Sequence, residues 1–341
     1  MISSRHVDVS ILIVSFNTRQ MTLDAISSVV RETKDVAYEI IVVDNNSADG
    51  SADAIAAHPA APKLIALSDN IGFGRANNLA AEYATGDYVL LLNPDTIVRD
   101  RAIDRLVGFA RENKRALIWG GRTVFADGSL NPASCWQRIT LFNLVARATG
   151  LAGLFPNSPI FNPEAYGGWA RDTVREVDIV SGCFLLIPRS IWMALGGFDP
   201  QFFMYGEEAD LCLRARRIGA RPLLNPHATI VHFGGASEKT RAGKMVKLIA
   251  AKATLIERHW PRLAVPLGRF LLMMWPLSRW LACSTMALLQ KTGEKREAAD
   301  AWRTVWKSRE EWRTGYPKHL PEPGDRQFLP LALMTVARSV P

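Results

Sequence analysis

The feature that most constrains the fold is an alternation of strand and helix patterns over the first hundred residues. Short β-rich apolar runs stand at residues 9–15, 39–43, 63–67 and 87–92. Segments with apolar residues at helical spacing separate them, at residues 21–31, 52–57 and 73–83. Continuous apolar runs are typical of parallel strands covered by helices on both faces. The alternation therefore predicts βαβ units and a doubly wound, mostly parallel α/β sheet.

The pattern changes twice further along the chain. Residues 126–175 are rich in Gly, Pro, Asn and aromatic residues, which predicts a long irregular insert of functional importance. Strands are then expected at 176–181, 183–187, 221–224 and 229–232, with helices at 189–195 and 207–218. From Lys239 to about Trp312 the pattern is helical. We divide the chain into residues 1–240, with halves 1–125 and 126–240, and a helical extension over 241–341.

The extension holds the positive charge of the chain. The net charge is +8, and residues 241–315 alone contain 15 Lys and Arg against 6 Asp and Glu. Residues 265–290 are the most apolar window, but Arg279 and Pro276 argue against a membrane span. We interpret the window as an interfacial element whose lipid-facing residues are Leu271, Leu272, Met273, Met274, Trp275 and Trp280. Anionic headgroups would meet Arg258, Arg262, Lys291, Lys295 and Arg296.

Two other interpretations of residues 265–290 stay open, a buried core helix followed by a solvated basic helix and a true span. Nucleic-acid binding is disfavoured because the basic residues alternate with Leu, Met and Trp and follow no reading motif. Four widely spaced cysteines indicate a reducing compartment, and the N-terminus lacks the pattern of a signal peptide. There is no P-loop, and residues 70–74 match the dinucleotide fingerprint poorly.

Polar clusters follow several of the expected strands, where ligands bind in open α/β sheets. Asp44 in "VVDNNSADGS" could accept hydrogen bonds from a nucleobase, and Arg75 in "SDNIGFGRANN" could meet a phosphate at a helix start. Asp95 in "LLLNPDT" is a candidate metal ligand. Taken alone, an Asp that ends a strand is most often a turn former.

A fourth cluster, "GGFDPQFFMYGEEADLCLRARRIG", begins a helix with Glu207 and Glu208. Neighbouring carboxylates repel, so one can keep a raised pKa suited to general-base catalysis. The ordinary interpretation is that acidic residues stabilise the first turn of a helix. His232 in "VHFGGAS" ends a later strand, where it can face an aspartate of another strand end.

Together these segments resemble family 2 inverting glycosyltransferases, in particular the rhamnosyltransferase-like branch. Over residues 8–240 the chain has "SILIVSFN", "IIVVDNNSADGS", "NIGFGRANN", "GDYVLLLNPDT", the Glu207–Glu208 cluster and "VHFGGAS" in the family's order. The resemblance implies a GT-A-type fold, a mostly parallel sheet flanked by helices. It also implies a nucleotide-binding half (1–125) followed by an acceptor and catalytic half (126–240).

The resemblance also assigns roles to individual residues. Asp44 is similar to the base-binding aspartate, Asp95 to the last acid of the D-x-D metal motif and His232 to an additional metal ligand. Asn93 replaces the first acid of that motif, and Glu208 replaces the usual catalytic aspartate, so either Glu207 or Glu208 can take the proton. We further predict donor contacts from Asn17, Asn70, Gly72, Arg75 and Asn93, and acceptor contacts from Asp210 and Trp169.

The implied function is metal-dependent, inverting sugar transfer in cell-surface polysaccharide synthesis, with Mn²⁺ or Mg²⁺ as the cofactor. The expected donor is a nucleoside-diphosphate sugar, rhamnose being favoured, and the acceptor is a polyprenyl-diphosphate-linked saccharide or another oligosaccharide. The expected location is the cytoplasm, peripherally bound to the inner leaflet of the membrane. Two alternatives remain, a non-catalytic nucleotide-sugar-binding partner of an assembly complex and a sugar-nucleotide pyrophosphorylase.

Overall fold

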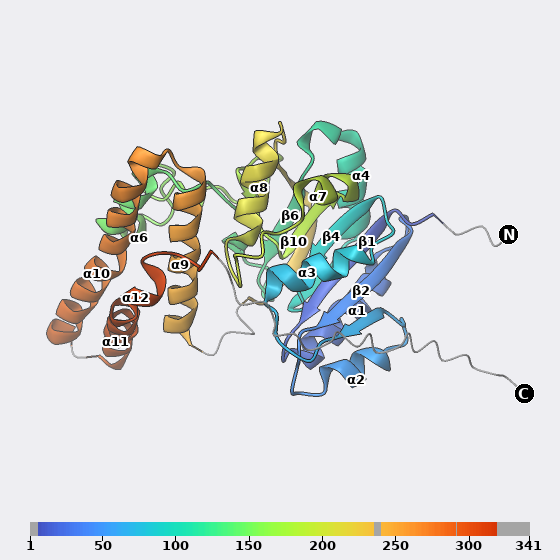
Figure 1. Cartoon of the computed structure of the whole chain (residues 1–341), viewed down its shortest axis with the longest axis horizontal. Coiled ribbons are helices and arrows are strands. Elements are labelled where there is room, and N and C mark those ends of the chain that lie inside the picture. The colour runs from blue at the N-terminus through green and yellow to red at the C-terminus, as the bar shows by residue number, and fades with distance from the viewer. Residues whose placement is uncertain (1–5, 235–239, 291, 319–341) are drawn as a thin grey trace, which may run out of the picture.

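The N-terminal part of the chain forms the predicted βαβ units. The computed structural model describes residues 6–234, 240–290 and 292–318 (Figure 1). The strands are β1 (Val9–Ser15), β2 (Tyr38–Asp44), β3 (Lys63–Ala66) and β4 (Tyr88–Leu92), and the helices are α1 (Arg19–Glu32), α2 (Ser51–Ala56) and α3 (Phe73–Glu82). Strands β1 to β4 pair in parallel, and the register sets Ser15 opposite Asp44. The polar segments after β1, β2 and β4 therefore leave the same edge of the sheet.

The rest of the sheet is mixed. It adds β5 (Thr96–Val98), β6 (Trp119–Val124), β8 (Arg175–Glu176), β10 (Phe184–Pro188) and β11 (Leu223–His232), in the order β3-β2-β1-β4-β10-β6-β11-β5 with β8 beside β11. Strand β10 is antiparallel to both β4 and β6, and β11 is antiparallel to β5. The sequence pattern predicts two strands at 221–224 and 229–232, which is wrong. One strand runs through both, with a register shift between Asn225 and Thr229 where Pro226 cannot donate to the ladder.

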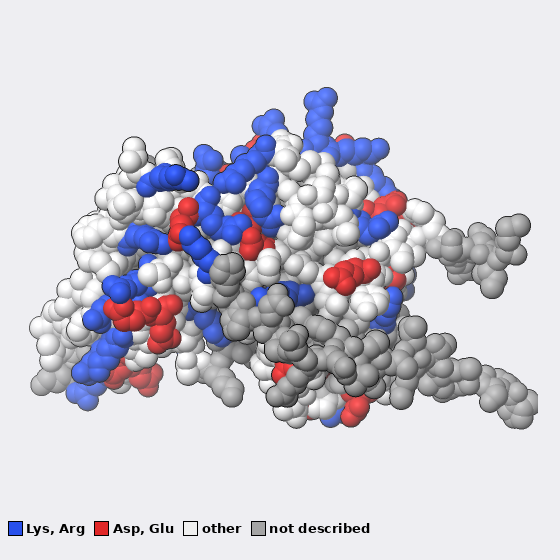
Figure 2. All heavy atoms as spheres, in the orientation of Figure 1, with Lys and Arg blue, Asp and Glu red and all other residues white. Residues whose placement is uncertain are grey.

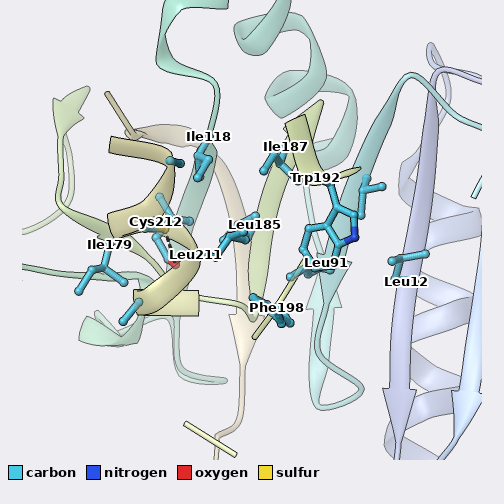
Figure 3. Packing of buried hydrophobic residues seen from close by; sticks show 14 of the residues in the cluster. Leu12, Leu91, Ile118, Ile179, Leu185, Ile187, Trp192, Phe198, Leu211 and Cys212 are labelled. Atoms are coloured by element: carbon cyan, nitrogen blue, oxygen red, sulfur yellow. Dashed lines mark hydrogen bonds between the residues drawn. The ribbon is translucent and has the colours of Figure 1, made fainter. Parts of the chain in front are cut away.

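Helices cover both faces of the sheet and enclose two hydrophobic cores. One core lies under α1, α2 and α4 (Ala102–Glu112), and the other lies under α3, α7 (Arg189–Leu195) and α8 (Glu207–Arg217). Figure 3 shows the second core, where Leu211 and Cys212 of α8 face Leu185 of β10 and Ile118. Truncating such a fully buried leucine typically destabilises a domain by about 2–5 kcal/mol. The position of α8 on the sheet is therefore firmly fixed.

The insert predicted to be irregular contains short regular elements. They are β7 (Cys135–Trp136), α5 (Leu141–Ala148) and α6 (Leu151–Leu154), and β7 pairs with β9 (Ile179–Val180) in a small second sheet. The Thr140 hydroxyl accepts a hydrogen bond from the Asn143 amide, and the Asn143 side chain accepts one from the Thr140 amide. This capping box is the local reason that α5 begins here.

The C-terminal helices form a third core together with α5. They are α9 (Arg241–His259), α10 (Val265–Gln290), α11 (Gly293–Lys307) and α12 (Arg309–Trp312), grouped to one side of the sheet in Figure 1. The extension was expected to run to residue 341, and residues 319–341 lie outside the described residues. Within those residues, no helix has the length and apolarity that a membrane crossing requires.

Helix α10 corrects part of the lipid-facing prediction. It continues through Pro276, and Leu272 and Trp275 are 1% and 6% exposed because they pack into the third core. Arg258, predicted to meet headgroups, forms ion pairs with Asp199 and Asp210 instead. Lys291 lies outside the described residues. Other apolar residues of α10 are exposed, among them Phe270, Leu281, Leu288 and Leu289.

Candidate active site

A cavity of about 640 Å³ opens where the strand ends, the insert and α9 meet. Among the predicted site residues, its walls contain Asn70, Asn93, Asp95, Glu207, Glu208 and His232. Those outside the lining are Asn17, Asp44, Gly72, Arg75, Trp169 and Asp210. The cavity therefore brings both acidic helix residues and both candidate metal ligands to one space, although more than a hundred residues of chain separate Asp95 from Glu207.

Sheet topology explains how Asp95 and His232 meet. Strand β5 begins directly after Asp95, and its antiparallel pairing with β11 sets Thr96 opposite His232. The Asp95 Oδ1 atom lies 3.5 Å from His232 Nε2, and both side chains are largely buried. Burial would lower the pKa of His232, but Cys183 and Asp95 outweigh it and raise that pKa to about 10. The two groups thus form a buried acid–imidazole pair in which a cation can replace the proton.

Asn93 completes a set of oxygen and nitrogen donors. Its Nδ2 atom is 3.5 Å from His232 Nε2, while its buried Oδ1 atom has no hydrogen-bond partner among the described residues. The described residues include no cluster of three or more His, Cys, Asp or Glu that could hold a metal ion. A carboxylate, an imidazole and an unpartnered amide oxygen nevertheless suit a hard divalent cation that takes its remaining ligands from a substrate.

Glu207 and Glu208 begin α8 directly after two residues with positive φ angles, Tyr205 (68°) and Gly206 (90°). Glu207 is 4% exposed, and its buried Oε2 atom has no hydrogen-bond partner among the described residues. Glu208 is only partly buried. Both residues line the cavity, but Glu207 is the more deeply buried of the two.

The difference in burial affects the pKa values of the two glutamates. Burial and the charge of Glu208 raise the pKa of Glu207 well above its usual value, and burial also raises the pKa of Glu208. Since two carboxylates this close resist joint ionisation, the more enclosed Glu207 keeps the proton and Glu208 is the group that ionises. The deeper burial of Glu207 favours Glu208 as the base, and the choice between the two stays a prediction.

The C-terminal segment holds the loop that precedes these acids. The Tyr316 hydroxyl donates a hydrogen bond to the Met204 carbonyl, and Gln201 Nε2 donates to the Tyr316 carbonyl at 3.0 Å. The Tyr316 amide in turn donates to Thr254 Oγ1 of α9 at 2.8 Å. Sequence reasoning does not find this contact, because Tyr316 belongs to no recognisable motif.

Asp44 and Asn17 lie together beyond the first two strands. Asp44 Oδ2 accepts a hydrogen bond from the Ser47 amide, while its buried Oδ1 has no described partner. Asn17 joins the two loops because its side chain accepts a hydrogen bond from the Ala48 amide at 2.8 Å. The free acceptor on Asp44 is the feature that a nucleobase could use.

Asn70, Gly72 and Arg75 surround the start of α3. Asn70 Oδ1 accepts hydrogen bonds from the Gly72 amide and from Asn45 Nδ2, both at 2.9 Å. Gly72 has a φ of 86°, and a Cβ there would lie 2.7 Å from the Phe203 carbonyl oxygen. The buried Nε of Arg75 has no described partner. This loop is therefore built tightly against the segment that leads to α8.

Asp210 and Trp169, the predicted acceptor residues, are not brought to the cavity. Asp210 is fully buried, and its carboxylate receives Arg214, Arg258 and His259, which joins α8 to α9. Trp169 packs edge-on against Tyr166 and donates its indole hydrogen to Thr173. Figure 2 shows Lys and Arg side chains interspersed with carboxylates on the surface between the sheet and the C-terminal helices.

Several lining residues escape the sequence analysis. Arg147 and Glu164 of the insert, Lys252 of α9 and Trp275 of α10 also line the cavity. Periodicity indicates at most that such residues belong to helices or loops, and the contacts that unite them connect distant segments. Only the fold brings them to the same wall.

The chain is similar in sequence to known glycosyltransferases. The family model described as "Glycosyl transferase family 2" matches residues 10–166. The O-antigen biosynthesis protein RfbC of Myxococcus xanthus is 28% identical over 239 residues, 68% of this chain and 18% of that protein. The N-acetylglucosaminyl-diphospho-decaprenol L-rhamnosyltransferase of Mycobacterium tuberculosis is 30% identical over 207 residues, 57% of this chain and 66% of that protein. These matches thus cover less than two thirds of each relative's length.

A solved structure shares the fold. The mannosyltransferase PcManGT of Pyrobaculum calidifontis, in complex with GDP-Man and Mn²⁺, superposes with a TM-score of 0.56 at 15% identity. The superposition covers 91% of this chain and 88% of that one. The expected GT-A-type architecture, a mostly parallel sheet flanked by helices with helices at the C-terminus, is confirmed.

Proposed function

The chain belongs to glycosyl transferase family 2, and on that premise we propose that it is an inverting, metal-dependent hexosyltransferase. It moves a sugar from a nucleoside-diphosphate donor to a hydroxyl of a lipid-linked saccharide during cell-surface polysaccharide synthesis. One observation carries the proposal. A cation-binding pair, Asp95 and His232, shares a single cavity with an ionisable acid, Glu208, at the loop-bearing edge of the sheet.

The donor half of the reaction rests on the strand ends. The free Oδ1 of Asp44 accepts a hydrogen bond from the nucleobase, and the unpartnered Nε of Arg75 supports a position near the phosphates. Asp95 and His232, with Asn93 Oδ1 beside them, would hold Mn²⁺ or Mg²⁺ together with the donor diphosphate. When bound, the cation offsets the negative charge that develops on the leaving nucleoside diphosphate.

The acceptor half rests on α8. Glu208 takes the proton from the acceptor hydroxyl as its oxygen bonds to the anomeric carbon, and the carbon–oxygen bond to the diphosphate breaks on the opposite face. One carboxylate base is sufficient, because attack from the face opposite the leaving group inverts the anomeric centre directly. Glu207 is already protonated, so it cannot take the acceptor proton in place of Glu208.

Rhamnose is the favoured sugar because relatives at 27–30% identity carry rhamnosyltransferase names. The mycobacterial relative is named for a diphospho-decaprenol saccharide, which supports a lipid-linked acceptor. The exposed apolar residues of α10, with Arg296 beside Leu288, support peripheral binding to the inner leaflet from the cytoplasm.

The direct test incubates the protein with dTDP-rhamnose, UDP-sugars or GDP-mannose and a short-chain lipid-diphosphate saccharide, with and without Mn²⁺. We expect nucleoside diphosphate release and a glycosylated product that require the cation, and dTDP-rhamnose to be the best donor. Asp95→Ala should abolish cation-dependent donor binding in calorimetry. Binding without turnover for every donor would instead favour a non-catalytic nucleotide-sugar partner.

A further inference from the structure

Three charged side chains from distant segments form a cluster in the wall of the cavity. Arg147 of α5 donates its Nε hydrogen to Glu164 Oε2 at 2.5 Å, and Lys252 of α9 donates to Glu164 Oε1. The Glu164 and Lys252 residues are 5% and 7% exposed, and all three line the cavity. The sugar-transfer chemistry proposed above uses none of them.

The cluster carries one uncompensated positive charge, because two cations share one carboxylate. An unpaired charge in a buried site is unfavourable because it loses its hydration, unless a counter-ion meets it. Burial would raise the pKa of Glu164, but Arg147 and Lys252 outweigh it and lower that pKa to about 2, so the carboxylate stays ionised. Burial lowers the pKa of Lys252, and the charge of Glu164 opposes that shift. A ligand with negative charge would complete this balance.

Arg147 is arranged to receive such a ligand. Only its Nε has a hydrogen-bond acceptor among the described residues, so the terminal Nη1 and Nη2 atoms are uncommitted there. The guanidinium carbon lies 4.9 Å from the centre of the Trp275 ring, which limits the orientations of the group. A planar fork of free N–H donors is the geometry that binds phosphate oxygens.

The cluster is close to the catalytic end of the cavity. A Cβ placed on Gly206, the residue before Glu207, would lie 3.0 Å from the Cβ of Ala251, which precedes Lys252. The apolar residues Ile139, Leu248 and Leu255 line the same cavity. An anionic group at the cluster could thus belong to a molecule whose sugar hydroxyl reaches Glu208.

We propose that Arg147 and Lys252 form the subsite for the phosphate or diphosphate of the acceptor, with Trp275 holding the Arg147 guanidinium in place. This inference rests on the proposed function and specifies its substrate, a saccharide joined to a lipid through an anionic phosphate linkage. The donor diphosphate occupies the other end, at Asp95 and His232. The C-terminal helices then contribute directly to acceptor recognition.

The test compares two acceptors that end in the same sugar, a short-chain lipid-diphosphate saccharide and an uncharged alkyl glycoside. In Arg147→Gln, Glu164 keeps its partner Lys252, so the cluster stays charge-balanced and the fold is expected to persist. We expect the KM for the diphosphate acceptor to rise about 10- to 100-fold, the loss typical of a charged hydrogen bond. The KM values for the alkyl glycoside and for the donor should stay within about twofold of wild type.

Matched controls separate this role from a structural one. Arg138→Gln removes an exposed arginine of the same insert that does not line the cavity and should leave all three KM values unchanged. Arg147→Lys keeps the charge but loses the fork, and should fall between wild type and Arg147→Gln. Equal KM increases for both acceptors, or a change confined to the donor, would overturn the subsite and leave the cluster a structural ion network.

Two further measurements complete the test. The first asks whether a free diphosphate binds at Arg147, and the second separates failure of the subsite from failure of the proposed function. Inorganic pyrophosphate should compete with the diphosphate acceptor on wild type and much less on Arg147→Gln, whereas competition unchanged by the substitution would contradict the subsite. Donor cleavage without acceptor, followed as nucleoside diphosphate release, should be equal in wild type and Arg147→Gln. If wild type neither cleaves a donor nor glycosylates either acceptor, the proposed function fails, and calorimetric titration of pyrophosphate into both proteins still decides the subsite.

Discussion

At the scale of single residues, two adjacent glutamates differ because of their surroundings. Glu208 faces the cavity and is expected to act as the base, so Glu208→Gln should lower kcat by about 10²–10⁴-fold. Glu207 keeps its proton, and a glutamine mimics that neutral state, so Glu207→Gln should lower kcat by less than about 10-fold. Initial rates of product formation at saturating donor measure both, and a larger loss for Glu207→Gln would exchange the two roles.

The same burial gives a stability prediction for Glu207. Folding raises its pKa above the ordinary 4.5, so the folded state holds a proton that the unfolded chain releases. Stability from this group is therefore present below pH 4.5 and is lost as the pH rises through the raised pKa. Glutamine does not titrate, so Glu207→Gln should gain on the order of 1 kcal/mol over wild type at pH 8 and little at pH 4.

Urea unfolding at the two pH values tests this prediction. Asp172→Asn, a substitution of an exposed acid in the insert, serves as the control that changes charge without burial. An advantage of Glu207→Gln that is equal at both pH values would contradict the buried-proton account.

Individual site residues were predictable where strand ends determine them. Asp44, Asp95 and His232 each follow or end a strand, and the pairing of β5 with β11 joins the last two. Asp210 lies one turn beyond Glu207, so its sequence position suggested a site role, although its arginine and histidine partners make it part of the packing between α8 and α9. Sequence reasoning cannot distinguish these cases, because two of the three partners of Asp210, Arg258 and His259, come from α9.

At the scale of elements, the glycines at the two ends of α8 form a matched pair. Gly206 has a φ of 90°, and a Cβ there would meet Ala251 and the Phe202 ring at 3.0 Å. Gly219 has a φ of 95°, but a Cβ there would meet no atom within 4 Å. Gly219→Ala should therefore cost about 1–2 kcal/mol from backbone strain alone. Gly206→Ala should cost roughly a further 1–3 kcal/mol from overpacking and also reduce kcat.

Thermal unfolding and initial rates of both variants check this prediction. The informative quantity is kcat at a temperature where both variants remain folded, since only Gly206 lines the cavity. Equal kcat values for the two variants would show that the turn before Glu207 tolerates rearrangement.

The elements differ in how far the sequence determines them. Strands β1, β2 and β4 and helix α3 are flanked by polar turns and carry clear periodicity, so their predicted bounds are within two residues of the observed ones. The sequence pattern predicts two strands in place of β11, because Pro226 and the polar residues around it resemble a turn. Helix α10 is apolar on nearly every side, and periodicity cannot tell whether such a helix faces lipid or a protein core.

At the scale of the whole molecule, the structure changes which side chains the proposed membrane attachment would use. Leu272 and Trp275 are core residues, whereas Leu288 and Leu289 are 76% and 79% exposed at the end of α10. Leu288→Ser together with Leu289→Ser should weaken binding to anionic liposomes several-fold in flotation assays, because the apolar area available for insertion falls. Transfer to a water-soluble acceptor should be unchanged.

A matched control for this surface is Ile218→Ser, which removes an exposed apolar residue of the sheet region. Retained flotation of the Leu288 and Leu289 double variant would assign attachment to another surface. Point substitutions are preferable to deletion of residues 261–341, because that deletion also removes Tyr316 and its hydrogen bond to the Met204 carbonyl.

The hydrogen bond from Tyr316 also has a consequence for synthesis on the ribosome. Tyr316 is translated 112 positions after Met204, whose carbonyl accepts that hydrogen bond. A nascent chain that ends at residue 312 contains every described strand of the sheet and both glutamates, but not Tyr316. We therefore expect the loop before Glu207 to be fixed, and sugar transfer to begin, only after the C-terminal helices have been translated and have docked.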